Sequence, residues 1–222
     1  RPINVNAGQN VTITPGAGSN LDFSQTQSLG VTAVNDIVIN VPGSLSITTG
    51  ANQVLQAGRN LTVTSGAGQV YNAGGTIDWR GGVVNVTSGS TQDWRGPNGI
   101  SLTSTTGELS LLNSGARHLS LDSSNANDNV ASARDVAISA PSQVLVRSNP
   151  TFGVTSINAT NDVRMTAGTF QPLNFSGRNA RVKSGNDILL TANQIRGDNS
   201  SGTSLNLDAG RNLTLTNPNS TT

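Results

Sequence analysis

The sequence contains no cysteine, which excludes disulfide bonds and thiolate metal sites. It has one histidine, His118, so His-rich metal sites are excluded and a Ser-His-Asp triad would depend on that residue alone. His118 directly precedes an apolar pair, so an exposed turn residue is the simpler interpretation. No apolar run reaches the roughly 18 residues of a membrane-spanning helix. We therefore expect no cofactor, no bound metal and no membrane insertion.

Charged residues are also scarce. They make up 11% of the chain, and the net charge is +1. Because nucleic acids and anionic membrane surfaces are bound by clustered Lys and Arg, neither is expected as a partner. Good helix formers are few, and no stretch keeps the apolar spacing of an amphipathic helix over three turns. The polar surface consists of Ser, Thr, Asn and Gln, which favour strands and turns.

One short unit is abundant instead. AGRNLTVT at residues 57–64 recurs as AGRNLTLT at 209–216 and, more weakly, as AGQNVTIT at 7–14. A polar corner that ends in Asn and precedes alternating apolar and hydroxyl residues predicts a turn followed by a strand with one buried face. The spacing of such units therefore becomes the main clue to the fold.

Related units follow one another at intervals of 23 to 27 residues, when the residue just before the first apolar position is taken as the corner. The nine corner residues are Asn10, Asp36, Asn60, Val83, Glu108, Asp135, Asp162, Asp187 and Asn212. The first and third positions after each corner are apolar in every copy. Asn and Asp predominate at the corner, where we expect them to tolerate left-handed backbone and to bond their own turn.

Further apolar pairs lie between these units, so each interval has room for about three short strands. The pairs are Leu45 with Ile47, Leu119 with Leu121 and Val144 with Val146 after a corner, and Ile100 with Leu102, Ala180 with Val182 and Leu205 with Leu207 before one. A repeat of about 25 residues with three strands predicts one coil of a parallel β-helix, whereas a β-propeller has a period near 40. We predict a single all-β domain over residues 1–222, a parallel β-helix of eight to nine coils.

Two DWRG segments, at residues 78–81 and 93–96, contain both tryptophans of the chain. Exposed Trp and Arg side chains anchor interfaces and stack on sugars. The candidate ligand or receptor contacts are therefore Tyr71, Trp79, Arg80, Trp94 and Arg95. Because the two segments are 15 residues apart, less than one coil, a Trp that fills a wide part of the interior is the alternative interpretation.

The carboxylates give no clear catalytic pattern. Asp36, Asp135, Asp162 and Asp187 occupy corners where Asn also occurs, so turn formation accounts for them. A carbohydrate-active β-helix enzyme is the alternative, and it would require three or more carboxylates that converge on one groove. We assign no catalytic residue and do not expect an enzyme.

Two other features allow local functions. Outward Thr-x-Thr pairs, such as Thr12 with Thr14 and Thr62 with Thr64, occur in flat ice-binding β-helices, but equivalent positions hold Val38 and Arg164, so the array is broken. Residues 122–134 and 148–171 depart from the repeat and are predicted to be irregular. Loops that protrude from a solenoid commonly bind ligands.

The units AGRNLTVT, its copies and SGNDILLT at residues 184–191 resemble the repeats of filamentous haemagglutinins and related two-partner-secreted exoproteins, over nearly the whole chain. This family includes the stick proteins of contact-dependent growth inhibition. The resemblance implies a right-handed parallel β-helix that is part of a longer exoprotein. It also implies export through an outer-membrane two-partner secretion transporter, to the surface or surroundings of a Gram-negative bacterium.

The family's role is structural or adhesive: it presents loops or a distal domain to a receptor or glycan on a host or bacterial cell. GPNGI at residues 96–100 is similar to the NPNGI element of the family's amino-terminal secretion domain, with Gly96 in place of the first Asn. That domain is therefore an alternative to an internal shaft segment.

Overall fold

The computed structural model describes residues 1–73, 76–90, 92–95, 100–106, 108–113, 119–122, 128–132, 136–140, 144–147, 154–167, 172–176, 179–198 and 204–217. These segments form β-strands joined by turns. In this part of the chain no helix is long and apolar enough to cross a membrane.

The described strands form three sheets. Sheet A contains β1 (Ile3–Ala7), β4 (Leu29–Ala33), β7 (Gln53–Ala57), β10 (Ile77–Gly81), β13 (Ile100–Ser104), β16 (Asp128–Ser132), β19 (Val154–Ala159), β22 (Asn179–Ser184) and β25 (Ser204–Ala209). Sheet B contains β2 (Val11–Ile13), β5 (Ile37–Val41), β8 (Asn60–Ser65), β11 (Val83–Ser88), β14 (Leu109–Asn113), β17 (Val136–Ser139), β20 (Val163–Thr166), β23 (Ile188–Thr191) and β26 (Leu213–Thr216). Sheet C contains β3 (Leu21–Thr26), β6 (Leu45–Thr49), β9 (Gln69–Ala73), β12 (Gln92–Arg95), β15 (Leu119–Asp122), β18 (Val144–Arg147), β21 (Pro172–Ser176) and β24 (Gln194–Asp198).

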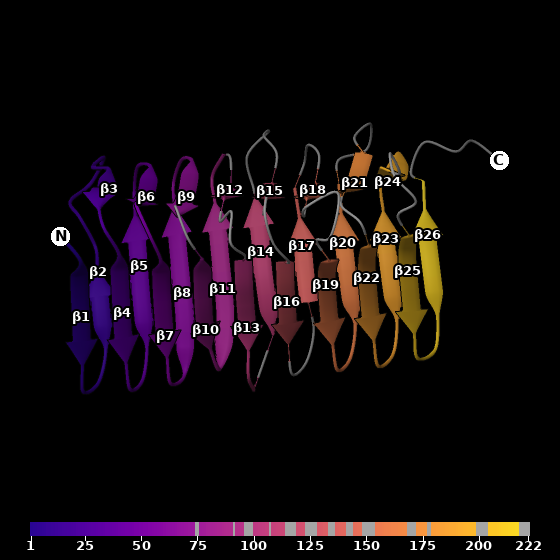
Figure 1. Ribbon diagram of the computed structural model, residues 1–222, viewed down its shortest axis with the longest axis horizontal. Helices are drawn as coiled ribbons and strands as arrows, with labels where there is room; N and C mark the ends of the chain where they lie inside the picture. Colours follow the sequence, from indigo (N-terminus) through magenta and orange to yellow (C-terminus); the bar gives the residue numbers. More distant parts are fainter. Residues whose placement is uncertain are drawn as a thin grey trace.

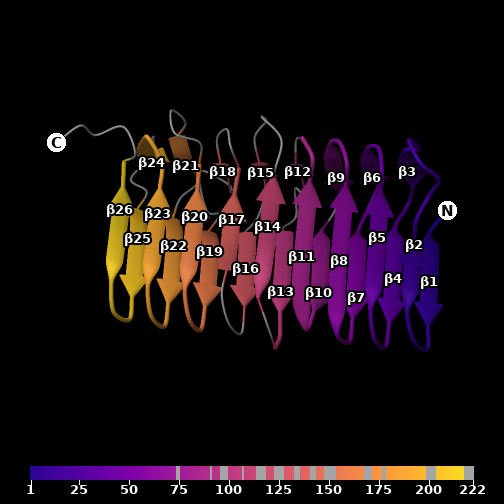
Figure 2. The ribbon, with the colours of Figure 1, turned by 180° about the vertical axis from the view of Figure 1, so that it is seen from behind.

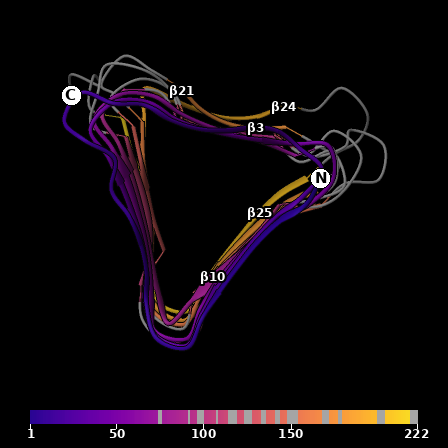
Figure 3. The ribbon, with the colours of Figure 1, turned by 90° about the vertical axis from the view of Figure 1, so that its left-hand side faces the viewer.

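The chain visits the three sheets in the order A, B, C and then begins the next coil (Figure 1). Every strand pairs in parallel with its equivalents in the adjacent coils, and Figure 2 shows the same stack from behind. Seen along the stack, the coils superpose as a triangle with one sheet on each side (Figure 3). The predicted fold class, an all-β parallel β-helix with a short repeat, is confirmed.

The register of sheet B reproduces the repeat predicted from the corners. The residue after each corner pairs with the residue after the next, in one continuous column. This column is Val11, Ile37, Leu61, Val84, Leu109, Val136, Val163, Ile188 and Leu213. All of its members from Val11 to Ile188 are buried. The apolar pairs predicted between the corners lie on the other two strands of each coil. Pairs that follow a corner lie in sheet C, and pairs that precede one lie in sheet A.

Strand alternation explains the core. Along β5 and β8, residues at every second position are buried and their neighbours are half-buried or exposed. Neighbouring parallel strands are about 4.8 Å apart, so each inward Val, Leu or Ile packs on the equivalent side chains above and below it. The narrow interior is therefore filled by stacked aliphatic columns.

The same spacing explains the glycine of the AGRN corner. A Cβ added at Gly58 would overlap the carbonyl oxygen of Val34 in the preceding coil, and one at Gly210 would overlap that of Gly185. The corner backbones therefore leave no space for a side chain at Gly58 and Gly210, whereas Val34, at the equivalent position of the coil before Gly58, carries one.

The predicted irregular segments are more regular than expected. Residues 122–134 include β16, which pairs with β13 and β19, and residues 148–171 include β19 and β20. The prediction of irregularity was wrong there, because β19 and β20 keep the alternation of buried and outward residues, with Ile157, Val163 and Met165 buried. The other residues of both segments that could form loops, including 123–127 and 148–153, lie outside the described part of the chain.

The register makes a prediction for coil deletion. Removal of residues 163–187 joins Asp162 to Ile188, which occupies the same column as Val163. We expect this variant to fold with a thermal midpoint near that of the parent. Removal of residues 164–187 instead turns Ile188 and Leu190 outward, at a cost of about 1.5–3 kcal/mol for each exposed side chain. Thermal unfolding followed by circular dichroism compares the two variants, and equal midpoints would contradict the register.

Candidate functional site

The corner residues form a side-chain ladder along the edge between sheets A and B. Asp36 Oδ1 accepts hydrogen bonds from the backbone N–H of Asn60 (3.1 Å) and from its Nδ2 (3.0 Å). Asp187 Oδ1 does the same for Asn212, at 3.2 and 3.0 Å. Asn10 Oδ1 accepts from the backbone N–H of Asp36 at 3.2 Å. The corner side chains thus bond the next coil, and the expectation that they bond their own turn was wrong.

The predicted corner Asp162 belongs to the same ladder, since its Oδ1 accepts from the backbone N–H of Asp187 (3.3 Å). The other two edges have similar corners that the sequence analysis did not identify. Asn20 accepts from the N–H of Ser44 (2.8 Å) just before sheet C, and Asn52 from that of Thr76 (3.0 Å) just before sheet A. The signal that could have found them is an Asn placed directly before an inward strand residue. The predicted corner Asp135 lies outside the described residues.

Arginine completes the corner in the two AGRN copies. Arg59 Nη2 lies 3.4 Å from Asp36 Oδ2, and Arg211 Nη2 lies 2.8 Å from Asp187 Oδ2. The Arg211 hydrogen bond, aided by its charge and by Asn212, holds the pKa of the Asp187 carboxyl below its ordinary value. The stabilisation from this carboxylate is therefore present at neutral pH and is lost as the pH falls through the lowered pKa. Because the side chains are exposed, the contribution is small.

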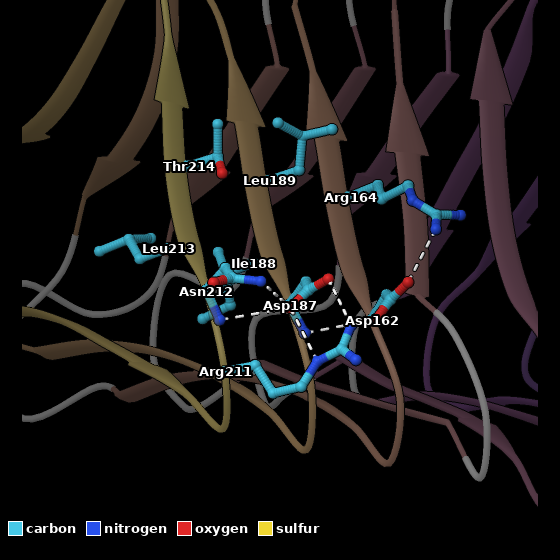
Figure 4. Close-up of a pocket in the computed structure, with 9 residues that line it drawn as sticks. All are labelled: Asp162, Arg164, Asp187, Ile188, Leu189, Arg211, Asn212, Leu213 and Thr214. Atoms are coloured by element: carbon cyan, nitrogen blue, oxygen red, sulfur yellow. Dashed lines mark hydrogen bonds and ion pairs between the residues drawn. The ribbon is translucent and has the colours of Figure 1, made fainter.

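The outer face of sheet B carries a polar groove over its last coils (Figure 4). We call it the sheet B groove; its volume is about 510 Å³. It is lined by Asp162, Arg164, Asp187, Ile188, Leu189, Arg211, Asn212, Leu213 and Thr214. Arg164 lies along its strand and pairs with Asp162 (Nη2 to Oδ2, 2.7 Å), while Arg211 reaches across the corner to Asp187. The groove thus offers guanidinium, carboxylate, amide and hydroxyl groups to a polar ligand.

The sheet B groove does not have the composition of a hydrolytic site. Its two carboxylates, Asp162 and Asp187, are each held by an arginine, whereas the enzyme alternative requires three or more that converge. No three His, Cys, Asp or Glu side chains in the described ranges are grouped so that they could hold a metal ion. His118 lies outside those ranges.

The column of outward Thr residues is interrupted, as the sequence indicates. Thr62 pairs with Val38 in the coil before it and with Asn85 in the coil after it.

The aromatic residues of the candidate contact set lie in the core. Tyr71, Trp79 and Trp94 have at most 1% of their surface exposed. Their ring centroids are 4.6 Å apart for Tyr71 and Trp79, 4.3 Å for Tyr71 and Trp94, and 4.6 Å for the two tryptophans. Trp79 points inward from sheet A and Trp94 from sheet C of the same coil, so they meet across the interior despite their 15-residue separation. The surface-contact interpretation is therefore wrong for all three, and the alternative of an aromatic filling holds.

The two arginines of the set are exposed but do not share a face. Arg80 is on β10 in sheet A, and Arg95 is on β12 in sheet C. Arg80 also borders a second hollow of about 430 Å³, together with Gln56 and Thr105. The structure thus splits the predicted contact set into a buried aromatic cluster and two separate surface cations.

Buried polar groups surround the aromatic cluster. Gln53, Gln69 and Gln92 are fully buried at the first inward position of their strands. Gln92 Nε2 donates to Gln69 Oε1 at 3.1 Å, and Gln53 Nε2 donates to the carbonyl of Ile47 at 2.8 Å. Sequence analysis missed these residues, although each falls where neighbouring coils place Leu or Ile. The coils around Tyr71 therefore have a mixed aromatic and amide core.

The ladder can be tested at Asp36. Its replacement by Ala removes two hydrogen bonds, so we expect a loss of about 1–3 kcal/mol in the free energy of unfolding. Asp36→Asn retains Oδ1 as an acceptor and should lose less. Chemical denaturation measures both, with Asp78→Ala, at an outward position of sheet A, as the control. Equal losses in the Ala and Asn variants would contradict the hydrogen-bond assignment.

Tyr71 predicts a pH limit. Burial raises its pKa well above the ordinary value, so the folded protein keeps the phenol neutral. The stability from this group is complete below the unfolded pKa of about 10 and is lost as the pH rises above it, because the unfolded chain releases the proton first. Tyr71 is the only tyrosine, so tyrosinate absorbance should appear together with loss of the circular dichroism signal. Tyr71→Phe supplies the blank, and titration near pH 10 with intact structure would contradict the burial.

Comparison with known proteins adds no identification to this geometry. No protein-family model matches the sequence. No curated protein matches it, and no solved structure matches it. The functional argument therefore depends on the residues and contacts described above.

Proposed function

We propose that this chain is a stiff structural segment, a shaft, of a secreted filamentous protein at the surface of a Gram-negative bacterium. The observation that carries the proposal is the continuous parallel pairing of the three sheets over the described coils, with a register shift between Phe23 and Thr26 where β3 pairs with β6. The role of such a shaft is reach: it presents loops or a distal domain to a target cell. This role needs no catalytic residue.

Stiffness follows from the direction of the backbone hydrogen bonds. In stacked parallel coils these bonds run along the axis of the rod, on all three sides of the triangle. Bending the rod would stretch the bonds of at least one sheet. The corner ladder adds side-chain bonds in the same direction, such as the one from Asn60 to Asp36. Packed aliphatic columns and the aromatic cluster oppose flattening of the interior.

The outer surface suits a protein that is exposed to its surroundings. It is mainly uncharged and polar, and the chain has no cysteine that oxidation could modify. We propose export through an outer-membrane transporter of the two-partner type, on the basis of the repeat resemblance. Stacking also favours this route, because each coil folds onto its predecessor and the growing rod can form as the chain emerges.

An adhesive contribution is proposed for the outer face. The sheet B groove and Arg80 offer hydrogen-bond donors and acceptors without a strong net charge, which fits a neutral glycan or a polar receptor loop better than a polyanion. The residues GPNG of the secretion-domain-like element, at 96–99, lie outside the described structure, while Ile100 begins β13 in the core. No described feature favours a carbohydrate-active enzyme over the shaft.

The export proposal makes a prediction in the source bacterium. Disruption of the partner transporter gene should trap the protein in the periplasm, because the folded rod has no other route through the outer membrane. Surface antibody labelling and added protease should detect it in the parent strain only. A protein exported by an unrelated route serves as the control, and unchanged surface labelling would contradict the proposal.

A further inference from the structure

The hollow beside Arg80, on the outer face of sheet A, has a volume of about 430 Å³. We call it the sheet A hollow. Arg80 is the one charged residue that lines it, Thr32, Gln56 and Thr105 supply the polar side chains, and the other lining residues are Ala and Gly. Small-molecule sites typically have volumes of about 300–1,000 Å³. The sheet A hollow is therefore large enough for a small polar ligand.

Three of the polar side chains form one column across neighbouring coils. Thr32 on β4 pairs with Gln56 on β7, and Gln56 pairs with Arg80 on β10 (Figure 1). All three occupy outward positions of their strands. Because neighbouring strands are about 4.8 Å apart, a hydroxyl, an amide and a guanidinium follow one another over about 10 Å. The column thus presents three different hydrogen-bonding groups in a row.

The charged group of the sheet A hollow is not engaged by a protein partner. In the sheet B groove each arginine pairs with an aspartate, and Arg59 at the corner next to the hollow pairs with Asp36. Within the described ranges, the side chains of Arg80, Gln56 and Thr32 make no ion pair or hydrogen bond. Arg80 is exposed. Its guanidinium and the two polar groups beside it are therefore available to a ligand.

Asp78 limits the charge of that ligand. It lies two residues before Arg80 on the same outward face of β10, so the two backbone positions are about 6.6 Å apart. A guanidinium binds a carboxylate through two parallel N–H···O hydrogen bonds. Asp78 would repel a dianion such as phosphate more strongly than a carboxylate, and its own oxygens can accept hydrogen bonds from hydroxyl groups. The arrangement thus favours a ligand that carries one carboxylate with hydroxyl groups beside it.

We propose that the sheet A hollow binds an acidic sugar, whose carboxylate pairs with Arg80 and whose hydroxyl groups bond Gln56, Thr32 and Asp78. An acidic sugar carries its carboxylate and several hydroxyl groups on one rigid ring, so a single residue of a glycan meets both requirements. The inference rests on the adhesive contribution proposed for the outer face, and it gives the glycan one carboxylate at this position. Because the hollow is exposed and polar, a monosaccharide should bind with millimolar affinity.

The test is a heteronuclear NMR titration of the 222-residue chain with the methyl glycoside of glucuronic acid. We expect saturable shifts of the backbone amide signals of Gln56, Gly58 and Thr105, which line the hollow. Methyl glucoside, which lacks the carboxylate, should bind at least about tenfold more weakly, because it loses the charge-assisted hydrogen bonds to Arg80. Acetate, which lacks the ring, should also bind more weakly, and inorganic phosphate more weakly still.

Three variants assign the contacts. Arg80→Gln should bind the glucuronic acid glycoside at least about tenfold more weakly than the parent. Arg95→Gln is the matched control, because Arg95 is also exposed and also follows Asp-Trp but lies in sheet C, and this variant should bind like the parent. Asp78→Asn should bind phosphate about two- to fivefold more tightly than the parent, because the repulsion is removed. Circular dichroism establishes that each variant is folded.

The outcomes separate this inference from the proposed function. Equal affinity for the glucoside and the glucuronic acid glycoside would overturn the carboxylate contact and leave the adhesive contribution standing. Equal affinity for acetate would overturn the sugar in favour of acidic groups in general, including those of a receptor loop. Equal losses in Arg80→Gln and Arg95→Gln would overturn the site. If neither sugar shifts any signal, the inference and adhesion at this hollow both fail, whereas the shaft is tested separately by the export experiment.

Discussion

The parallel stacking of one coil on the next is the constraint from which the other features follow. Equivalent backbone atoms repeat at about 4.8 Å along the rod, so every position is a column and every side chain has copies of its own environment above and below. Glycine at position 58 is required because the corner backbone of the coil below fills the space of a side chain. Asn and Asp suit the corner because their short side chains reach the N–H of the next coil and no further.

Column stacking also accounts for the scarcity of charge. A charged residue repeated at this spacing would face its own copies, and like charges opposite each other destabilise a sheet. Asp36 avoids this because Asn10 and Asn60 are its neighbours in the column. Asp162 and Asp187 are adjacent in the same column, and Arg164 and Arg211 pair with them. The ion pairs of the sheet B groove are thus explained by the repeat itself, without a ligand.

The sequence predicts what depends on spacing along one column, and it does not predict relations across the interior. Strand alternation and the corner intervals determine which residue follows Leu61 in its column, and that prediction is confirmed through Leu213. Whether Trp79 meets Trp94 depends instead on the triangular cross-section, which places sheets A and C of one coil opposite each other. The buried Gln69 and Gln92 escaped prediction for a related reason, since the hydrogen bond from Gln92 Nε2 to Gln69 Oε1 forms only when their coils are stacked.

A filled interior restricts where this protein can act. Aliphatic columns and the aromatic cluster occupy the inside of the described coils, so a ligand meets only the outer faces or the two ends. On the outer faces each residue is set by its column, and in the sheet B groove the charged groups pair with one another, as Arg211 does with Asp187, so that a ligand there would meet a nearly neutral polar surface. A group that acts on a ligand must therefore lie at an outward position of a column, as Arg80 and Arg164 do, because stacking closes the inward positions.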